Sequence, residues 1–246
     1  MNNNIAYSNE YQEHRKTFDY VFQDKYKTEI EEVPLTDGKH ILRISYFTDE
    51  SCEYNQYRVY ASETEVFDNN FNKVADFRNI NHSVDFYSVV EHSNGKNYLV
   101  FSIDLYGYSV MDLENYHVCN FVPEESFKGE GETFIWTDIC YSKKHNILAV
   151  DGCYWACPSS VEFFDFSTPE NLPYEKILSS YDMEGLLNID TDVIPIRWND
   201  EGSIVLKCCI DSESTNEVEE VVDIVSLAKV KESRQCGMLG ESTTTK

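Results

Sequence analysis

The chain has 246 residues, with 44 acidic and 20 basic side chains, and therefore a formal net charge of −24. This charge repels phosphate backbones and anionic lipid surfaces, so it argues against binding to nucleic acid or to a membrane surface. An aromatic content of 14% is too high for a disordered polyelectrolyte, because so many rings require burial. The length suits one large domain or two small ones, and all-β folds commonly reach this size as one unit.

The N-terminal twenty residues carry charges and lack an apolar core, so we expect no secretory signal peptide. The longest stretch without Asp, Glu, Lys or Arg runs for ten residues from Gly152 to Val161, whereas a membrane span needs about twenty apolar ones. Disulfide frameworks belong to short secreted domains. We therefore expect a cytoplasmic protein whose eight cysteines are reduced.

Residues 1–38 form a predicted N-terminal extension. Its apolar side chains recur at a spacing that favours a short helix, namely Tyr7, Tyr11, Phe18, Val21 and Phe22. The stretch from Phe18 to Val33 is equally compatible with a strand that closes the fold or with part of an additional repeat. These alternatives stay open at the level of sequence.

Residues 39–232 contain a repeated pattern in which two apolar residues precede an aspartate. The four copies are Val66-Phe67-Asp68, Val110-Met111-Asp112, Phe163-Phe164-Asp165 and Val221-Val222-Asp223, with aspartates 44, 53 and 58 residues apart. We expect these four aspartates to be structural, because Asp at the end of a strand accepts hydrogen bonds from turn amides.

Apolar, β-rich runs flank each copy, which predicts four strands per repeat. The first strands are expected at 41–47, 84–91, 134–141 and 193–198. The second are expected at 57–61, 98–103, 147–150 and 204–209, and the third end in the aspartates. The fourth are expected at 73–77, 117–121, 174–178 and 228–231.

Four antiparallel strands repeated at this period are typical of propeller blades. The copies resemble WD40-type repeats, in which the third strand ends with an apolar pair and Asp, although the Trp-Asp and Gly-His dipeptides of that family are absent. The resemblance implies an all-β, propeller-like ring of four or five four-stranded antiparallel blades over residues 39–232. A β-sandwich or a barrel is the alternative, and residues 233–246 are a predicted disordered tail.

The loop from Gly152 to Pro158 has the most unusual local sequence, and it resembles segments of uncharacterised bacterial proteins. Cys153 and Cys157 leave a redox or metal pair open, but zinc needs four ligands and a redox dithiol is usually spaced CxxC. We therefore favour a structural role for this loop. The aromatic residues that we expect to contact a partner are Tyr154, Trp155, Trp136 and Trp198.

Standard catalytic signatures are missing from the chain. There is no Gly-rich phosphate loop, no Gly-x-Ser-x-Gly elbow and, beside Cys153 and Cys157, no CxxC, CxxH or HxxxH pair. We therefore predict no catalytic residues, no metal and no cofactor. A cysteine and a histidine that meet only in space stay open, because such partners need not be close in sequence.

The acidic and aromatic composition favours a non-enzymatic scaffold that binds another protein, most readily a basic one. A narrower hypothesis is an acidic immunity or antitoxin-like protein that caps a basic toxin. The alternative is an enzyme or a binder of small molecules or carbohydrates that uses the central channel of the ring. That channel would be lined by Trp136, Trp155 or Trp198.

Overall fold

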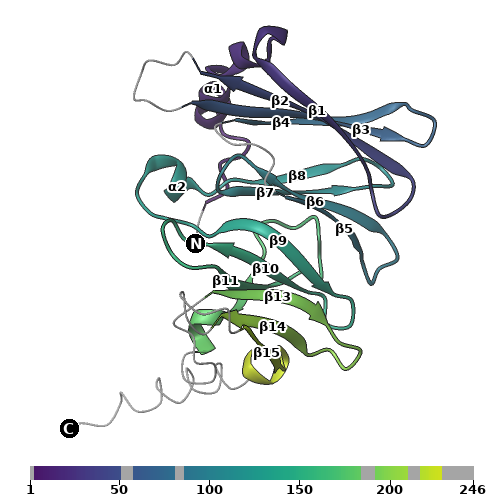
Figure 1. Ribbon diagram of the computed structural model, residues 1–246, viewed down its shortest axis with the longest axis vertical. Coiled ribbons are helices and arrows are strands. Elements are labelled where there is room, and N and C mark those ends of the chain that lie inside the picture. Colours follow the sequence, from purple (N-terminus) through teal and green to yellow (C-terminus); the bar gives the residue numbers. More distant parts are fainter. Residues whose placement is uncertain (1–2, 51–57, 81–85, 184–191, 210–216, 229–246) are drawn as a thin grey trace. The chain divides into compact units, whose positions relative to one another are not determined.

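The computed structural model describes residues 3–50, 58–80, 86–183, 192–209 and 217–228. Within them the chain is all-β apart from short helices, and four antiparallel sheets follow one another along the sequence (Figure 1). The chain divides into two compact units. The first comprises Met1–Asp138, Cys153–Trp155 and Thr168–Tyr174, and the second comprises Ile139–Gly152, Ala156–Ser167 and Glu175–Lys246.

The first sheet, in the first unit, consists of β1 (Lys27–Pro34), β2 (His40–Asp49), β3 (Val59–Asp68) and β4 (Lys73–Ile80), which are neighbours in that order. On β2, Leu42 and Ile44 are fully buried, as expected for one apolar face of an antiparallel strand.

One sequence prediction for this sheet was wrong. The runs 57–61 and 66–68 were expected to be separate strands, but residues 59–68 form the continuous strand β3, and Tyr57 lies outside the described residues. Ser62 and Thr64, between the two runs, are buried in β3, which pairs with β2 on one side and β4 on the other. The fourth strand of this sheet is β1, which comes from the N-terminal extension.

The second sheet has the order β5 (Tyr87–Glu91), β6 (Asn97–Ile103), β7 (Gly107–Asp112) and β8 (Val118–Phe121), and all four strands lie where the sequence predicted them. Every residue of β7 is buried. Apolar side chains of the first two sheets form one core, in which Phe77 stacks on Phe101 with ring centroids 3.9 Å apart. The short helix α2 (Glu124–Lys128) follows β8.

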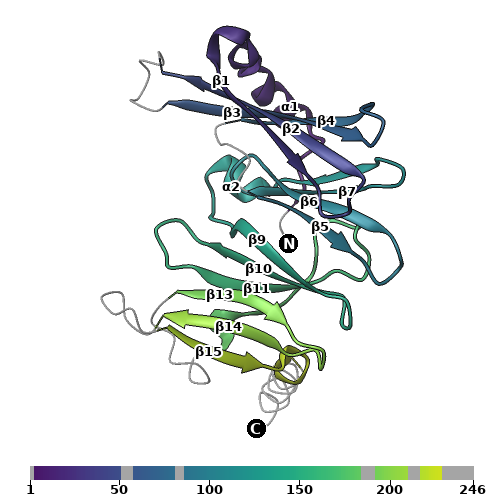
Figure 2. The same cartoon turned by 45° about the vertical axis from the view of Figure 1, so that its right-hand side comes forward.

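The N-terminal segment begins with helix α1 (Asn9–Lys16), followed by the 3₁₀ turns η1 (Asp19–Phe22) and η2 (Asp24–Tyr26) (Figure 2). Ser8 caps α1 by accepting a hydrogen bond from the Tyr11 backbone N–H at 3.2 Å. The Asp104 carboxylate, which follows β6, binds Arg15 of α1 at 2.8 Å and also accepts from the Tyr11 hydroxyl. These contacts attach the helix to the second sheet.

The third and fourth sheets also follow chain order. The third contains β9 (Ile135–Ser142), β10 (Ile147–Cys153), β11 (Ser160–Asp165) and β12 (Lys176–Ser179), and the 3₁₀ turn η3 (Ser180–Met183) follows it. The described strands of the fourth are β13 (Val193–Trp198), β14 (Ile204–Cys209) and β15 (Glu217–Val222). A core of the second unit joins these sheets and includes the fully buried Phe163 and Leu206.

The C-terminal predictions are tested only in part. A strand was expected at 228–231, but residues 224–228 are helical, and residues 229–231 lie outside the described part of the chain. The expected tail at 233–246 lies there too. None of the helices in the described residues has the length and apolar character to cross a membrane. The all-β prediction and the series of antiparallel blade-like sheets are confirmed, whereas closure into a ring stays a prediction.

Candidate functional site

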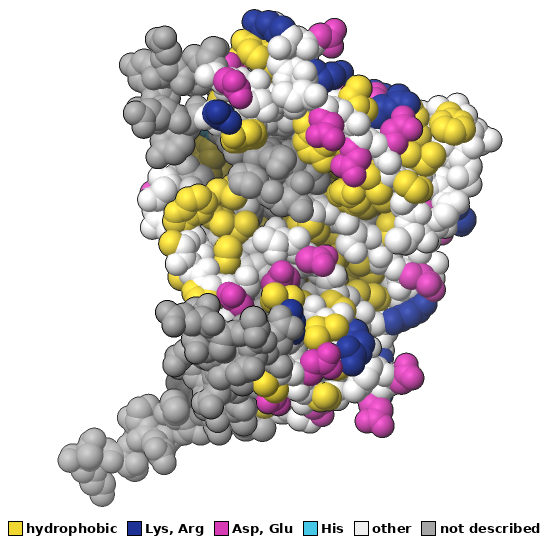
Figure 3. Space-filling view, in the orientation of Figure 1, with side chains coloured by type: hydrophobic (Ala, Val, Ile, Leu, Met, Phe, Trp, Pro, Cys, Tyr) yellow, Lys and Arg dark blue, Asp and Glu magenta, His cyan; other side chains and the backbone are white. Residues whose placement is uncertain are grey.

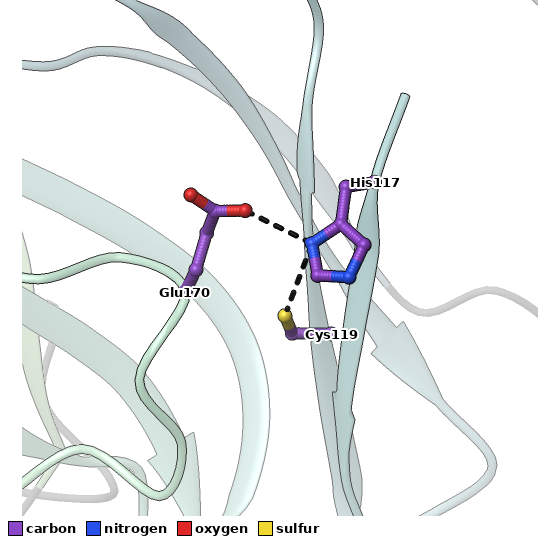
Figure 4. A group of neighbouring side chains, drawn as sticks. All are labelled: His117, Cys119 and Glu170. Atoms are coloured by element: carbon purple, nitrogen blue, oxygen red, sulfur yellow. Dashed lines mark hydrogen bonds and ion pairs between the residues drawn. The ribbon is translucent and has the colours of Figure 1, made fainter. Parts of the chain in front are cut away.

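A histidine, a cysteine and a glutamate meet beside β8, the edge strand of the second sheet (Figure 4). His117 immediately precedes β8 and Cys119 lies within it, so the two side chains, two residues apart, extend from the same face. Glu170 comes from the segment between β11 and β12 that belongs to the first unit. One donor atom from each residue lies within 4.8 Å of the other two.

The contacts converge on one ring nitrogen of the histidine. His117 Nδ1 lies 2.9 Å from Glu170 Oε1 and 3.6 Å from Cys119 Sγ. The His117 side chain is 63% exposed and that of Glu170 is 38% exposed, so the cluster is open to solvent. Burial, together with the negative charge of Glu170, raises the pKa of the Cys119 thiol.

The turn between β7 and β8 positions His117. The His117 backbone N–H donates to the side-chain oxygen of Asn115 at 2.8 Å, and the His117 carbonyl accepts from the Asp112 backbone N–H at 3.0 Å. The buried Asp112 carboxylate in turn accepts from Lys96 at 2.6 Å and from the Glu114 backbone N–H at 2.8 Å. A repeat aspartate therefore fixes the backbone from which the histidine extends.

Tyr174 holds the segment that carries Glu170. Its backbone N–H donates to the Tyr108 hydroxyl at 3.0 Å, and its own hydroxyl donates to the Pro169 carbonyl at 2.6 Å. Tyr108 lies on β7, and the rings of Tyr108 and Tyr174 stack with centroids 5.4 Å apart. Burial raises the pKa of both phenols, so each remains a hydrogen-bond donor near neutral pH. These contacts of Tyr174 hold the backbone of the segment that carries Glu170 beside β7.

This arrangement suits ligation of an ion better than attack by a thiolate. In a nucleophilic relay, the thiol contacts one nitrogen of the imidazole and the carboxylate contacts the other. Here both Cys119 and Glu170 approach Nδ1. A nitrogen, a sulfur and an oxygen within 4.8 Å of one another are instead the donor types of a zinc-type site.

This cluster of three side chains was not predicted from the sequence. A usable signal was present, because His117 and Cys119 stand two apart in a predicted strand and so share a face. Glu170 lies 53 residues from His117, in a loop without a motif. Its place beside β8 depends on the tertiary contact between Tyr174 and Tyr108.

The four aromatic residues that were predicted to contact a partner differ in burial and do not all belong to the same unit. Trp136 is 4% exposed and stacks on Tyr108 with centroids 4.0 Å apart. Tyr154 is half-buried against Phe134, whereas Trp155 is 64% exposed. These residues belong to the first unit.

Trp198 belongs to the second unit, where its indole N–H donates to the Cys140 carbonyl at 2.9 Å. Its ring packs edge-on against Phe163.

The Cys153 and Cys157 thiols are not joined by a disulfide.

The four repeat aspartates accept hydrogen bonds from the turns that follow them. The backbone donors are Asn70 and Asn72 for Asp68, Glu114 for Asp112, Ser167 for Asp165, and Ser226 for Asp223. The side-chain hydrogen bonds from Asn72 and Ser226 are the main reason why the pKa values of Asp68 and Asp223 are lowered. Burial opposes the shift at Asp112, but the bonds from Lys96 and the backbone outweigh it and its pKa is lowered as well.

A second surface with functional potential is the acidic edge, which we define as residues 29–32 of β1, Glu29, Ile30, Glu31 and Glu32. Seven of the eight β1 residues are exposed. Glu32 pairs with Arg43 at 2.7 Å, and Glu31 accepts from the Tyr46 hydroxyl at 3.1 Å. Partial burial, with this hydrogen bond to Glu31, raises the pKa of Tyr46 to about 12. Among the described strands, β1 has one neighbour, β2, so its other edge faces no strand.

No protein-family model matches the chain. A curated protein, the uncharacterized protein R762 of Acanthamoeba polyphaga mimivirus, is 31% identical over 64 residues, which cover 24% of this chain and 26% of that protein. The match thus spans about a quarter of the length of the curated relative.

Two solved structures resemble the chain weakly. The bifunctional GH43-CE protein of Bacteroides eggerthii is 8% identical, with 83% of this chain and 26% of that chain covered and a TM-score of 0.35. The exo-β-1,3-galactanase 1,3Gal43A of Clostridium thermocellum is 11% identical, with 81% and 47% covered and a TM-score of 0.31. At this level of similarity, nothing about the activity of these proteins transfers to this chain.

Proposed function

We propose that the protein is a non-enzymatic binding scaffold that recognises a basic, extended segment of another protein at the acidic edge. The observation that carries the proposal is an exposed edge strand with three carboxylates in four residues, Glu29, Glu31 and Glu32. An edge strand directs half of its backbone N–H and C=O groups away from its neighbour, and an extended peptide can pair with them.

The charge balance favours a basic occupant. Two arginines of the first unit are engaged with carboxylates, Arg15 with Asp104 at 2.8 Å and Arg78 with Glu63 at 2.7 Å. The whole chain has a formal net charge of −24. A negative field of this kind speeds association with Lys- and Arg-rich partners and weakens as salt rises.

The acidic edge also offers apolar contact. Ile30 is 56% exposed and lies on the same face of the strand as Glu32, two residues further along. Lysine and arginine side chains combine a charged head with an aliphatic stem, so they can contact a carboxylate and an isoleucine together. Figure 3 shows that acidic side chains lie beside hydrophobic ones on the face it presents.

A charged edge strand has a second explanation, since carboxylates also keep edges from pairing with other copies of a chain. The two explanations differ in what substitution does. If the acid is only protective, its removal promotes self-association and leaves partner binding unchanged. If the acid recognises a partner, its removal weakens that complex specifically.

The test compares the full-length protein with two variants that each lose three negative charges. The edge variant is Glu29→Gln, Glu31→Gln and Glu32→Gln. The matched control is Glu130→Gln, Glu132→Gln and Glu175→Gln, all exposed and outside β1. Each tagged protein captures partners from host lysate at low and moderate salt, and mass spectrometry identifies what is retained.

We expect the native protein and the control variant to retain the same basic protein in near-equal amount, and the edge variant to lose it. Retention should fall as salt rises. Equal capture by all three proteins, or capture of nothing by the native protein, would contradict the proposal. A captured basic enzyme whose activity is blocked in the complex would support the narrower immunity-like role.

A further inference from the structure

One of the separations in the His117–Cys119–Glu170 cluster matches that of a tetrahedral metal site. With zinc bonds of about 2.05 Å to nitrogen, 2.3 Å to sulfur and 2.1 Å to oxygen, tetrahedral angles place nitrogen about 3.6 Å from sulfur and about 3.4 Å from oxygen. The observed separation of His117 Nδ1 from Cys119 Sγ is 3.6 Å. The 2.9 Å between Nδ1 and Glu170 Oε1 is a hydrogen-bond distance, and it needs to lengthen by about half an ångström to admit an ion.

The adjustment required is a side-chain rotation. The Glu170 side chain is partly exposed, so it has room to rotate, while its backbone is tied to β7 through Tyr174 and Tyr108. The backbone of His117 is held by the turn before β8, and Cys119 lies within the strand. The backbone thus places two donors on one face, and the Glu170 carboxylate completes the site.

We propose that His117 Nδ1, Cys119 Sγ and a Glu170 carboxylate oxygen bind one zinc-type divalent ion, with water as the fourth ligand. The donor set selects this class, because a thiolate and an imidazole favour borderline-soft ions over magnesium or calcium. Binding releases the Cys119 thiol proton, and the imidazole proton resides on Nε2. The thiolate and the carboxylate neutralise the two charges of the ion.

The surrounding charge favours a cation. Lys96 interacts electrostatically with Glu170, and its ammonium group is engaged by the Asp112 carboxylate at 2.6 Å. The net negative charge of the chain raises the local concentration of cations further. The site is open to solvent through the exposed His117 ring, so the ion has an entry path.

Cobalt(II) is the probe for this proposal, because a cobalt–thiolate bond gives a charge-transfer absorption band in the near ultraviolet. The full chain, stripped with a chelator, is titrated with Co²⁺ and then with Zn²⁺ as a competitor. The variants are Cys119→Ser and Glu170→Gln. The matched control is Cys157→Ser, which removes an exposed thiol from another segment. Circular dichroism checks that each variant folds.

We expect one equivalent of Co²⁺ to produce the band in the native protein and in Cys157→Ser, and Zn²⁺ to remove it. Cys119→Ser should abolish the band, and Glu170→Gln should weaken Co²⁺ binding by about tenfold or more. A native protein without the band overturns the proposal, as does a band that survives in folded Cys119→Ser. The edge variant should bind the ion as the native protein does. The proposed metal site and the proposed protein-binding surface are therefore tested independently of each other.

Discussion

Replacement of Asp112 by asparagine should destabilise the first unit far more than the same change at Asp68. Asp112 is fully buried and uses both carboxylate oxygens. Oδ1 accepts from the Glu114 N–H at 2.8 Å, and Oδ2 accepts from Lys96 at 2.6 Å and from Asn115 at 3.0 Å. An asparagine can present only one acceptor atom, so its amide N–H₂ must face one of these donors.

The expected cost combines a lost charge-assisted hydrogen bond with an unsatisfied buried donor, about 2–3 kcal/mol. For a chain of this size, that lowers the thermal midpoint by roughly 4–12 °C. At Asp68, Oδ1 accepts both backbone bonds, from Asn70 and Asn72, and an asparagine oxygen can keep them. The bond that the change removes, from the Asn72 side chain to Oδ2 at 3.0 Å, is exposed to solvent, so its loss costs little. Asp68→Asn should therefore change the midpoint by no more than about 2 °C.

The assay is thermal unfolding at neutral pH, followed by circular dichroism, for the native protein and the two variants. A fall in midpoint for Asp112→Asn that is no larger than for Asp68→Asn would refute the reasoning. Such a result would mean that burial of the charged pair costs as much as its hydrogen bonds contribute.

Three further outcomes are expected. Gly107→Ala should abolish stable folding or lower the thermal midpoint by several degrees, because a Cβ at this position would lie 2.7 and 2.8 Å from two backbone oxygens. Resistance to proteolysis measures this effect. Trp136→Ala should cost about 3–5 kcal/mol in urea unfolding, whereas exposed Trp155→Ala should change stability by less than about 0.5 kcal/mol. The folded-state pKa values of Asp112 and Asp223 are lowered, so the native state binds fewer protons than the unfolded state. The contribution of these two carboxylates to the free energy of unfolding should be complete above about pH 4 and should be lost as the pH falls further. Urea unfolding midpoints, measured from neutral pH into acid, test this.

The strands of the blade-like sheets were predicted correctly from the sequence where apolar runs are separated by turn residues. Strands β5 to β8 lie where alternation and the Ser93-Asn94-Gly95 turn predicted them. The prediction from the sequence left β1 open as one of several alternatives and divided β3 in two, and both strands contain Glu residues, which are depleted in strands. Pairing with β2 determines the structure there.

The candidate site was predictable only to the level of two donors on one strand. His117 and Cys119 share a face by alternation, but Glu170 is brought to them by a buried tyrosine pair. The predicted aromatics were chosen for residue type alone. Type does not distinguish the buried Trp136 from the exposed Trp155, because that difference depends on packing against Tyr108.

The central claim is that β1 accepts a basic extended segment, and backbone hydrogen exchange tests it most directly. The probe is a peptide of alternating lysine and valine, added to the native protein and to the edge variant. The account predicts slower exchange within residues 27–34 of the native protein when the peptide binds, and no such change in the edge variant. Unchanged exchange in β1 at a peptide concentration that saturates binding would contradict it.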